Sequence, residues 1–202
     1  NVENAAVPKK VLDMYDAALA LSMVGDHKAA VEQLKLAVAE FPAFMLAYTE
    51  MGVQYLRLNE LEKADEALQV ALKIRPDAYE PLVNRGIVMF RLKRFTEAET
   101  FLRSALKAKE QSAVAHFYLG RTFASQKQYD TAEREFNRAI KIGGDQMKEA
   151  HRMLASMFLD REDHKRALAE LEIYLKLAPQ AADAEQLRGV VSELKALISQ
   201  KP

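Results

Sequence analysis

The sequence repeats itself with a period of 34 residues, and this period constrains the fold more than any other feature. The clearest copy covers residues 45–78. Its first half, 46–58, carries apolar residues at helical spacing and ends in a short polar break. A second helix is expected over 61–74, and Pro76 ends it because proline lacks an N–H donor and disfavours helical geometry in the preceding residue. The unit is therefore predicted to be an antiparallel helix hairpin.

Several positions of this hairpin recur in step along the chain. The small residue of the first helix recurs as Ala18, Gly52, Gly86, Gly120 and Ala155, and that of the second helix as Ala30, Ala64, Ala98, Ala132 and Ala167. Each series advances by 34 residues until the last interval, which is 35, and the extra residue is expected at Gly143-Gly144. Glycine inside a helix costs about 1 kcal/mol. We therefore expect the backbone of a neighbouring helix to pass close to Gly52, small residue against small residue.

These residues resemble the tetratricopeptide repeat family, whose pattern combines a large residue, a Leu-Gly pair, an aromatic residue, two alanines and a closing proline. The second copy shows this pattern as Tyr48, Met51-Gly52, Tyr55, Ala64, Ala71 and Pro76. The resemblance covers about 170 of the 202 residues. The family's tryptophan is absent, and its slot holds Met14, Tyr48, Leu82, His116 and His151. The resemblance implies an all-α fold, a right-handed α-α superhelix of the solenoid type.

The repeats define the expected domain organisation. Residues 1–10 are expected to be an N-terminal lead-in, and residues 182–202 a capping helix and tail. Between them we predict five repeats over 11–181, at 11–44, 45–78, 79–112, 113–147 and 148–181. A helix over 182–199 would cover the apolar edge that ends a stack of repeats. Alternatively, this last helix docks in a groove of another molecule.

The overall charge and composition restrict the class of partner. The chain has 29 acidic and 29 basic residues, so we expect no general attraction to nucleic acid. Cysteine is absent, which excludes disulfides and thiolate chemistry. No apolar run approaches the roughly 20 residues of a membrane span. The chain begins at Asn1 rather than Met, so we expect a processed or trimmed product.

No motif in the sequence indicates an enzyme, a cofactor site or a metal site. The four histidines, His27, His116, His151 and His164, occupy slots that hold apolar or aromatic residues in other repeats, so we interpret them as packing residues. Carboxylates such as those of Glu133 and Glu135 are expected on solvated helix faces. A Gly-rich phosphate loop and a serine-centred triad are both missing.

In the resembled family, ligands lie on the concave face, which is lined by the first helices. We expect a protein or peptide partner to contact the residues that project from these helices. The candidate binding residues are Tyr15, Leu19, Thr49, Val53, Arg57, Val83, Asn84, Ile87, Arg91, Phe117, Arg121 and Arg152. The N-terminal half of this set is largely apolar, and exposed apolar patches usually mark interaction sites. The alternative is that part of the apolar row packs inside the protein.

The arginines suggest a more specific hypothesis about the partner. Arg57, Arg91, Arg121 and Arg152 are expected along the inner row, and arginine can bind carboxylates in bidentate fashion. The sequence therefore predicts a protein–protein interaction scaffold whose groove takes an apolar peptide with some acidic character. The alternatives are a self-associating protein, with the same surface buried in a homodimer, and an accessory region of a larger enzyme.

Overall fold

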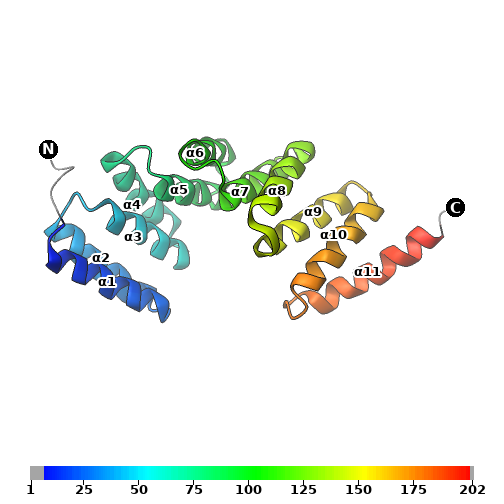
Figure 1. The fold of residues 1–202 in the computed structure, drawn as a ribbon, viewed down its shortest axis with the longest axis horizontal. Coiled ribbons are helices and arrows are strands. Elements are labelled where there is room, and N and C mark those ends of the chain that lie inside the picture. Colours follow the sequence, from blue (N-terminus) through cyan, green and yellow to red (C-terminus); the bar gives the residue numbers. More distant parts are fainter. Residues whose placement is uncertain (1–6, 201–202) are drawn as a thin grey trace. The chain divides into compact units, whose positions relative to one another are not determined.

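The structure, a computed structural model, describes residues 7–200 as a series of helices joined by short turns (Figure 1). The helices are α1 (Lys9–Met23), α2 (His27–Glu40), α3 (Met45–Arg57), α4 (Leu61–Ile74), α5 (Tyr79–Arg91), α6 (Phe95–Ala108), α7 (Ala113–Ser125), α8 (Tyr129–Gly143), the 3₁₀ helix η2 (Gly144–Met147), α9 (Lys148–Asp160), α10 (His164–Leu177) and α11 (Ala184–Ser199). The expected all-α fold of helix pairs is confirmed. Residues 1–6 of the lead-in expected at 1–10 lie outside the described residues. Its last two residues, Lys9 and Lys10, belong to α1, which corrects that boundary.

The helices pack mainly against their neighbours in the chain. Each odd-numbered helix from α1 to α9 pairs with the helix that follows it, and most pairs also contact the next hairpin. The chain divides into two compact units, Asn1–Glu110 and Gln111–Pro202. The first unit contains α1 to α6, and the second contains α7 to α11. In the second unit α11 packs on α10, where the sequence analysis expected a helix that ends the stack.

The turn inside each hairpin has the same backbone geometry. One residue after each first helix has a positive φ: Gly25 at 82°, Asn59 at 61°, Lys93 at 61°, Lys127 at 59° and Glu162 at 58°. The following residue donates its N–H to the carbonyl five residues earlier, as Glu60 does to Tyr55 at 2.9 Å. This arrangement satisfies carbonyl groups at the end of the helix. Only the first repeat supplies the glycine that this conformation favours.

The glycine of the first helix faces a large side chain, and this corrects the expectation that it faces another small residue. The backbone of the neighbouring helix is also close at Gly86, where an added Cβ atom would lie 3.3 Å from the N atom of Leu102. A Cβ atom added to Gly52 would lie 2.5 Å from Cγ of Leu68, and one added to Gly86 would lie 2.6 Å from Cγ of Leu102. Both leucines are fully buried. In these hairpins a large residue of the second helix therefore packs directly on a glycine of the first.

Candidate functional site

One row of positions on the first helices of unit 1 stays at the surface in all three repeats. These positions are spaced as i, i+4, i+7 and i+11, which places them on one side of a helix. We call this surface the first-helix face; it comprises Leu12, Asp16, Leu19 and Met23 on α1, Leu46, Glu50, Val53 and Arg57 on α3, and Glu80, Asn84, Ile87 and Arg91 on α5. Each of these residues is exposed or half-buried. Leu12 and Leu46 are 41% and 46% exposed, which is high for leucine.

Equivalent positions of the first-helix face carry side chains of similar chemical character on most of the three helices. Its third position is apolar in every repeat, as Leu19, Val53 and Ile87. On one side of this apolar row lie Arg57 and Arg91, and on the other lie acidic or amide side chains. Adjacent first helices are in direct contact. Nε2 of Gln54 on α3 donates to the hydroxyl oxygen of Ser22 on α1 at 2.8 Å, and Arg91 on α5 donates to the carbonyl oxygen of Leu56 on α3 at 2.8 Å. Within unit 1, the face therefore carries one apolar residue of this row on each of three first helices, with mostly polar residues on both sides.

A second column of the predicted binding residues is turned towards the interior. Thr49 and Val83 are each only 6% exposed, and the Thr49 hydroxyl donates to the carbonyl oxygen of Met45 at 2.9 Å. Tyr15 stacks near Phe44, with ring centroids 5.3 Å apart. The expectation that Thr49 and Val83 contact a ligand is therefore corrected. These residues instead pack inside the protein, which was the alternative considered for part of the apolar row.

The four predicted arginines have different roles. Arg91 also donates to Oδ1 of Asn59 at 2.6 Å, so it holds α5 to the turn after α3. Arg152 donates from Nε to Oδ2 of Asp183 at 2.8 Å, just before α11. The hydrogen bond from Arg152 holds the pKa of Asp183 below its usual value, and burial opposes this effect. Arg91 and Arg152 therefore mainly hold elements of the fold together.

The two remaining arginines differ in what surrounds them. In unit 2, Arg121 lies over the rings of Phe117 and Tyr118, 5.7 and 5.3 Å from their centroids. Phe117 also packs near Phe136, with centroids 5.9 Å apart. Arg57 is exposed and makes no hydrogen bond or ion pair with other residues in the range 7–200. Arg57 is thus the predicted arginine best placed to meet a partner's carboxylate.

Two histidines, predicted only to be packing residues, form hydrogen bonds at buried or partly buried positions. Nδ1 of His116 lies 2.6 Å from Oε2 of Glu135, and Nδ1 of His151 lies 2.6 Å from Oε2 of Glu170. Each pair joins a first helix to its own second helix across 19 residues. Glu135, which was expected on a solvated face, is only 7% exposed. Among the described residues, no three histidine or acidic side chains are grouped closely enough to hold a metal ion.

Comparison with known proteins establishes the family. One sequence model of the tetratricopeptide repeat matches residues 49–113, and a second matches residues 89–157, so that together they cover more than half of the chain. The chain belongs to the tetratricopeptide repeat family. None of the helices in the described part of this tetratricopeptide repeat protein is both long and apolar enough to cross a bilayer.

Curated relatives of this tetratricopeptide repeat chain include two subunits of one complex. Anaphase-promoting complex subunit 3 of Schizosaccharomyces pombe is 25% identical over 170 residues, which are 84% of this chain and 25% of the relative. Anaphase-promoting complex subunit CDC16 of Saccharomyces cerevisiae is 24% identical over 187 residues, which are 88% of this chain and 22% of the relative. The chain spans about a quarter of the length of these relatives.

Solved structures of tetratricopeptide repeat type share the fold. The type IV pilus biogenesis factor PilW superposes with a TM-score of 0.81 at 21% identity, over 96% of this chain and 94% of PilW. MamA from Desulfovibrio magneticus RS-1 superposes with a TM-score of 0.76 at 19% identity, over 88% and 99% of the two chains. The family and this fold support a protein-binding scaffold.

Proposed function

We propose that this chain is a protein–protein interaction scaffold that binds an extended segment of a partner protein across the first-helix face of unit 1. The observation that carries the proposal is the apolar row of Leu19, Val53 and Ile87, which crosses three neighbouring helices at the surface. Stacking of the hairpins does not require these side chains, because the stack is closed by the buried residues of the same helices. Their apolar character therefore points to a partner.

The spacing of the helices limits the form of the bound segment. Packed helices lie about 8–10 Å apart, and an extended chain in the polyproline II conformation advances about 3.1 Å per residue and turns once every three residues. An extended segment that crosses the helices would therefore present an apolar side chain about every third residue. Arg57 borders the row, so an acidic residue next to the one on Val53 would complete the contact. The preformed helices reduce the ordering cost of binding.

The proposal can be tested with synthetic nonapeptides that carry leucine at positions one, four and seven. Binding of fluorescein-labelled peptides with glutamate or glutamine at position five would be measured by fluorescence anisotropy. Val53→Ser removes an apolar contact and Arg57→Glu reverses the border charge. Together these changes should weaken binding of the glutamate peptide about tenfold or more. Lys73→Glu, on exposed α4 surface, is the matched control and should leave the affinity unchanged.

Two results would reject the proposal: equal affinity for the double variant and the original protein, or equal weakening by Lys73→Glu. The circular dichroism spectrum and the urea midpoint of each variant must match those of the original chain. Loss of affinity for the glutamate peptide but not the glutamine peptide in Arg57→Glu would assign the acidic preference to that arginine. Equal loss for both peptides would reject the acidic preference and retain the apolar row.

Self-association is a second candidate, favoured by the end of α1. Met23 and Val24 are 89% and 78% exposed, although both are apolar. A homodimer that covers them would also cover part of the first-helix face. Sedimentation velocity at several protein concentrations distinguishes the two functions. A dimer whose affinity falls in a Met23→Ser/Val24→Ser variant supports self-association, and a monomer at every concentration rejects it.

A further inference from the structure

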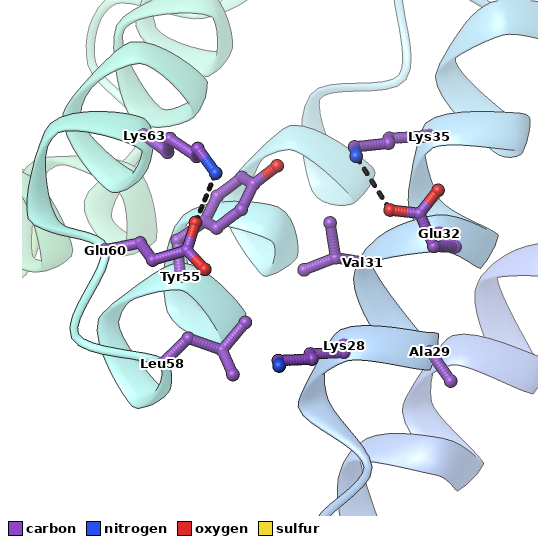
Figure 2. Close-up of a pocket in the computed structure, with 9 residues that line it drawn as sticks. All are labelled: Lys28, Ala29, Val31, Glu32, Lys35, Tyr55, Leu58, Glu60 and Lys63. Carbon is purple, nitrogen blue, oxygen red and sulfur yellow. Dashed lines mark hydrogen bonds and ion pairs between the residues drawn. The ribbon is translucent and has the colours of Figure 1, made fainter.

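A hollow lies between the first two hairpins, on a different surface of unit 1 from the first-helix face. Its volume is about 310 Å³. It is lined by residues of α2, of the end of α3 and of the start of α4, shown in Figure 2: Lys28, Ala29, Val31, Glu32, Lys35, Tyr55, Leu58, Glu60 and Lys63. None of them belongs to the first-helix face. The hollow therefore goes beyond the function proposed above.

Three lysines give the hollow its charge. Lys35 bonds to Glu32 at 2.7 Å and Lys63 bonds to Glu60 at 2.5 Å. Lys28 points across the hollow towards the side of Leu58 in Figure 2 and has no ion pair within residues 7–200. Three lysines against two glutamates leave a formal charge of +1. Because solvent-exposed ion pairs contribute little stability, an arriving anion can share Lys35 and Lys63 with their glutamates.

A tyrosine hydroxyl forms part of the same site. Tyr55 is only 8% exposed, and Figure 2 shows its hydroxyl between the amino groups of Lys35 and Lys63. This hydroxyl makes no hydrogen bond to any other residue in the described range. The hydrogen bond to Glu32 raises the pKa of Lys35, and that to Glu60 raises the pKa of Lys63. Both amines are therefore cationic at neutral pH, beside a hydroxyl that can donate.

The charge of the hollow is not repeated at the next junction. One repeat later, the three lysine positions hold Glu62, Gln69 and Glu97. The position of Val31 is taken there by Asp65, which bonds to Arg85 at 2.6 Å. The same hairpin packing thus exists without the lysines, so stacking of the repeats does not require them.

We propose that this hollow binds an acidic side chain of a partner protein. The carboxylate accepts from the Tyr55 hydroxyl and pairs with Lys28, Lys35 and Lys63, while an apolar neighbour in the partner lies on the half-buried Leu58. A water molecule occupies about 30 Å³ in the liquid, so 310 Å³ holds one or two side chains rather than a folded element. The occupant is therefore a short peptide segment with an apolar residue beside an acidic one.

The test uses two acetylated tetrapeptide amides, Ala-Leu-Glu-Ala and Ala-Leu-Gln-Ala, added to the ¹⁵N-labelled chain. The glutamate peptide is expected to cause saturable shifts of the backbone amides over residues 28–35 and 55–63. The affinity derived from these shifts should be at least fivefold weaker for the glutamine peptide. Lys28→Glu, which copies the residue found one repeat later, should weaken binding at least tenfold. Tyr55→Phe removes only the hydroxyl and should weaken it about 3- to 10-fold.

Controls separate this site from the first-helix face and from charge alone. Lys73→Glu makes the same charge change on α4 outside the hollow and should leave the shifts unchanged, as should Val53→Ser/Arg57→Glu. Failure of the first-helix face to bind its nonapeptides therefore does not affect this outcome. No saturable shift, equal response to both peptides, or tripolyphosphate binding as tightly as the glutamate peptide would overturn the proposal.

Discussion

Replacing Gly120 with alanine tests whether a large neighbouring side chain requires the glycine of the first helix. A Cβ atom on Gly120 would lie 2.6 Å from Cδ1, 2.7 Å from Cε1 and 2.9 Å from Cγ of Phe136. Phe136 is fully buried, so its ring cannot move into solvent. Overpacking a core typically costs about 1–3 kcal/mol, and alanine regains about 1 kcal/mol of helix propensity. We expect the free energy of unfolding to fall by about 1 kcal/mol.

Gly189→Ala is the matched control, because it is the same substitution in the same unit without a close neighbour. Gly189 lies inside α11, and a Cβ atom there would meet no atom within 4 Å. Helix propensity alone should then raise stability by up to about 1 kcal/mol. Urea unfolding followed by circular dichroism at 222 nm measures both variants. Equal stabilisation by the two substitutions would refute the close approach of Phe136.

A double variant adds a sharper criterion. The equivalent positions of the last repeat hold Ala155 and Leu171, both buried, so an alanine is accepted opposite a leucine. Gly120→Ala/Phe136→Leu should therefore be more stable than the sum of the two single changes predicts, by about 1 kcal/mol. Additive changes would show that the two side chains do not compete for the same space.

Three further predictions concern contacts in the turns and the second unit. Glu135→Ala should cost about 1–3 kcal/mol in urea unfolding because it leaves the ring nitrogen of His116 unpaired, whereas His116→Phe/Glu135→Leu should recover most of this loss. Lys93→Gly should stabilise the protein by up to about 1 kcal/mol, measured as a raised urea midpoint, because glycine adopts the positive φ without strain. Arg152 depresses the pKa of Asp183, so this ion pair should stabilise the fold above about pH 3.8. The stabilisation should be lost as the pH falls through the lowered pKa of Asp183. Asp183→Asn should remove this part of the pH dependence of the free energy of unfolding, measured by urea unfolding at several acidic pH values.

The helices could be predicted from the sequence because their signals are local. Apolar spacing and the following proline predicted a helix over 61–74, and α4 occupies Leu61–Ile74. Each helix assignment was also supported by the equivalent segments of the other four repeats. The extra residue of the last repeat interval was expected at Gly143-Gly144, and α8 ends there before η2.

The binding residues were harder to predict because a first helix in a stack is apolar on more than one side. It packs on its own partner helix and on the neighbouring hairpins, so two adjacent columns both look suitable for a ligand. Val53 lies at the surface, whereas Thr49, four residues earlier, is buried. The difference is a rotation of about 40° around the helix, since successive residues are about 100° apart. Helical periodicity alone does not determine which neighbour covers which column.

Side-chain pairs across helices were missed for a related reason. His116 and Glu135 occupy slots that hold apolar residues in some other repeats, and only the three-dimensional structure shows that they face each other. The lysines of the hollow had a signal that could have been used. Lys28 and Lys63 stand where the next repeat has Glu62 and Glu97, a reversal of charge between equivalent positions.

Such reversals are informative because the repeats supply their own comparison. Every hairpin needs the same buried slots, and the small slot of the second helix, for example, holds a fully buried alanine in all five copies. Positions outside these slots can differ without affecting the stack, as the exposed residues Lys28 on α2 and Glu62 at the equivalent position of α4 show. A charge pattern found at one junction and reversed at the next therefore has no role in stacking that both junctions share. By this reasoning, Lys28 and Lys63 are better candidates for recognition than arginines already bound within the fold, such as Arg91.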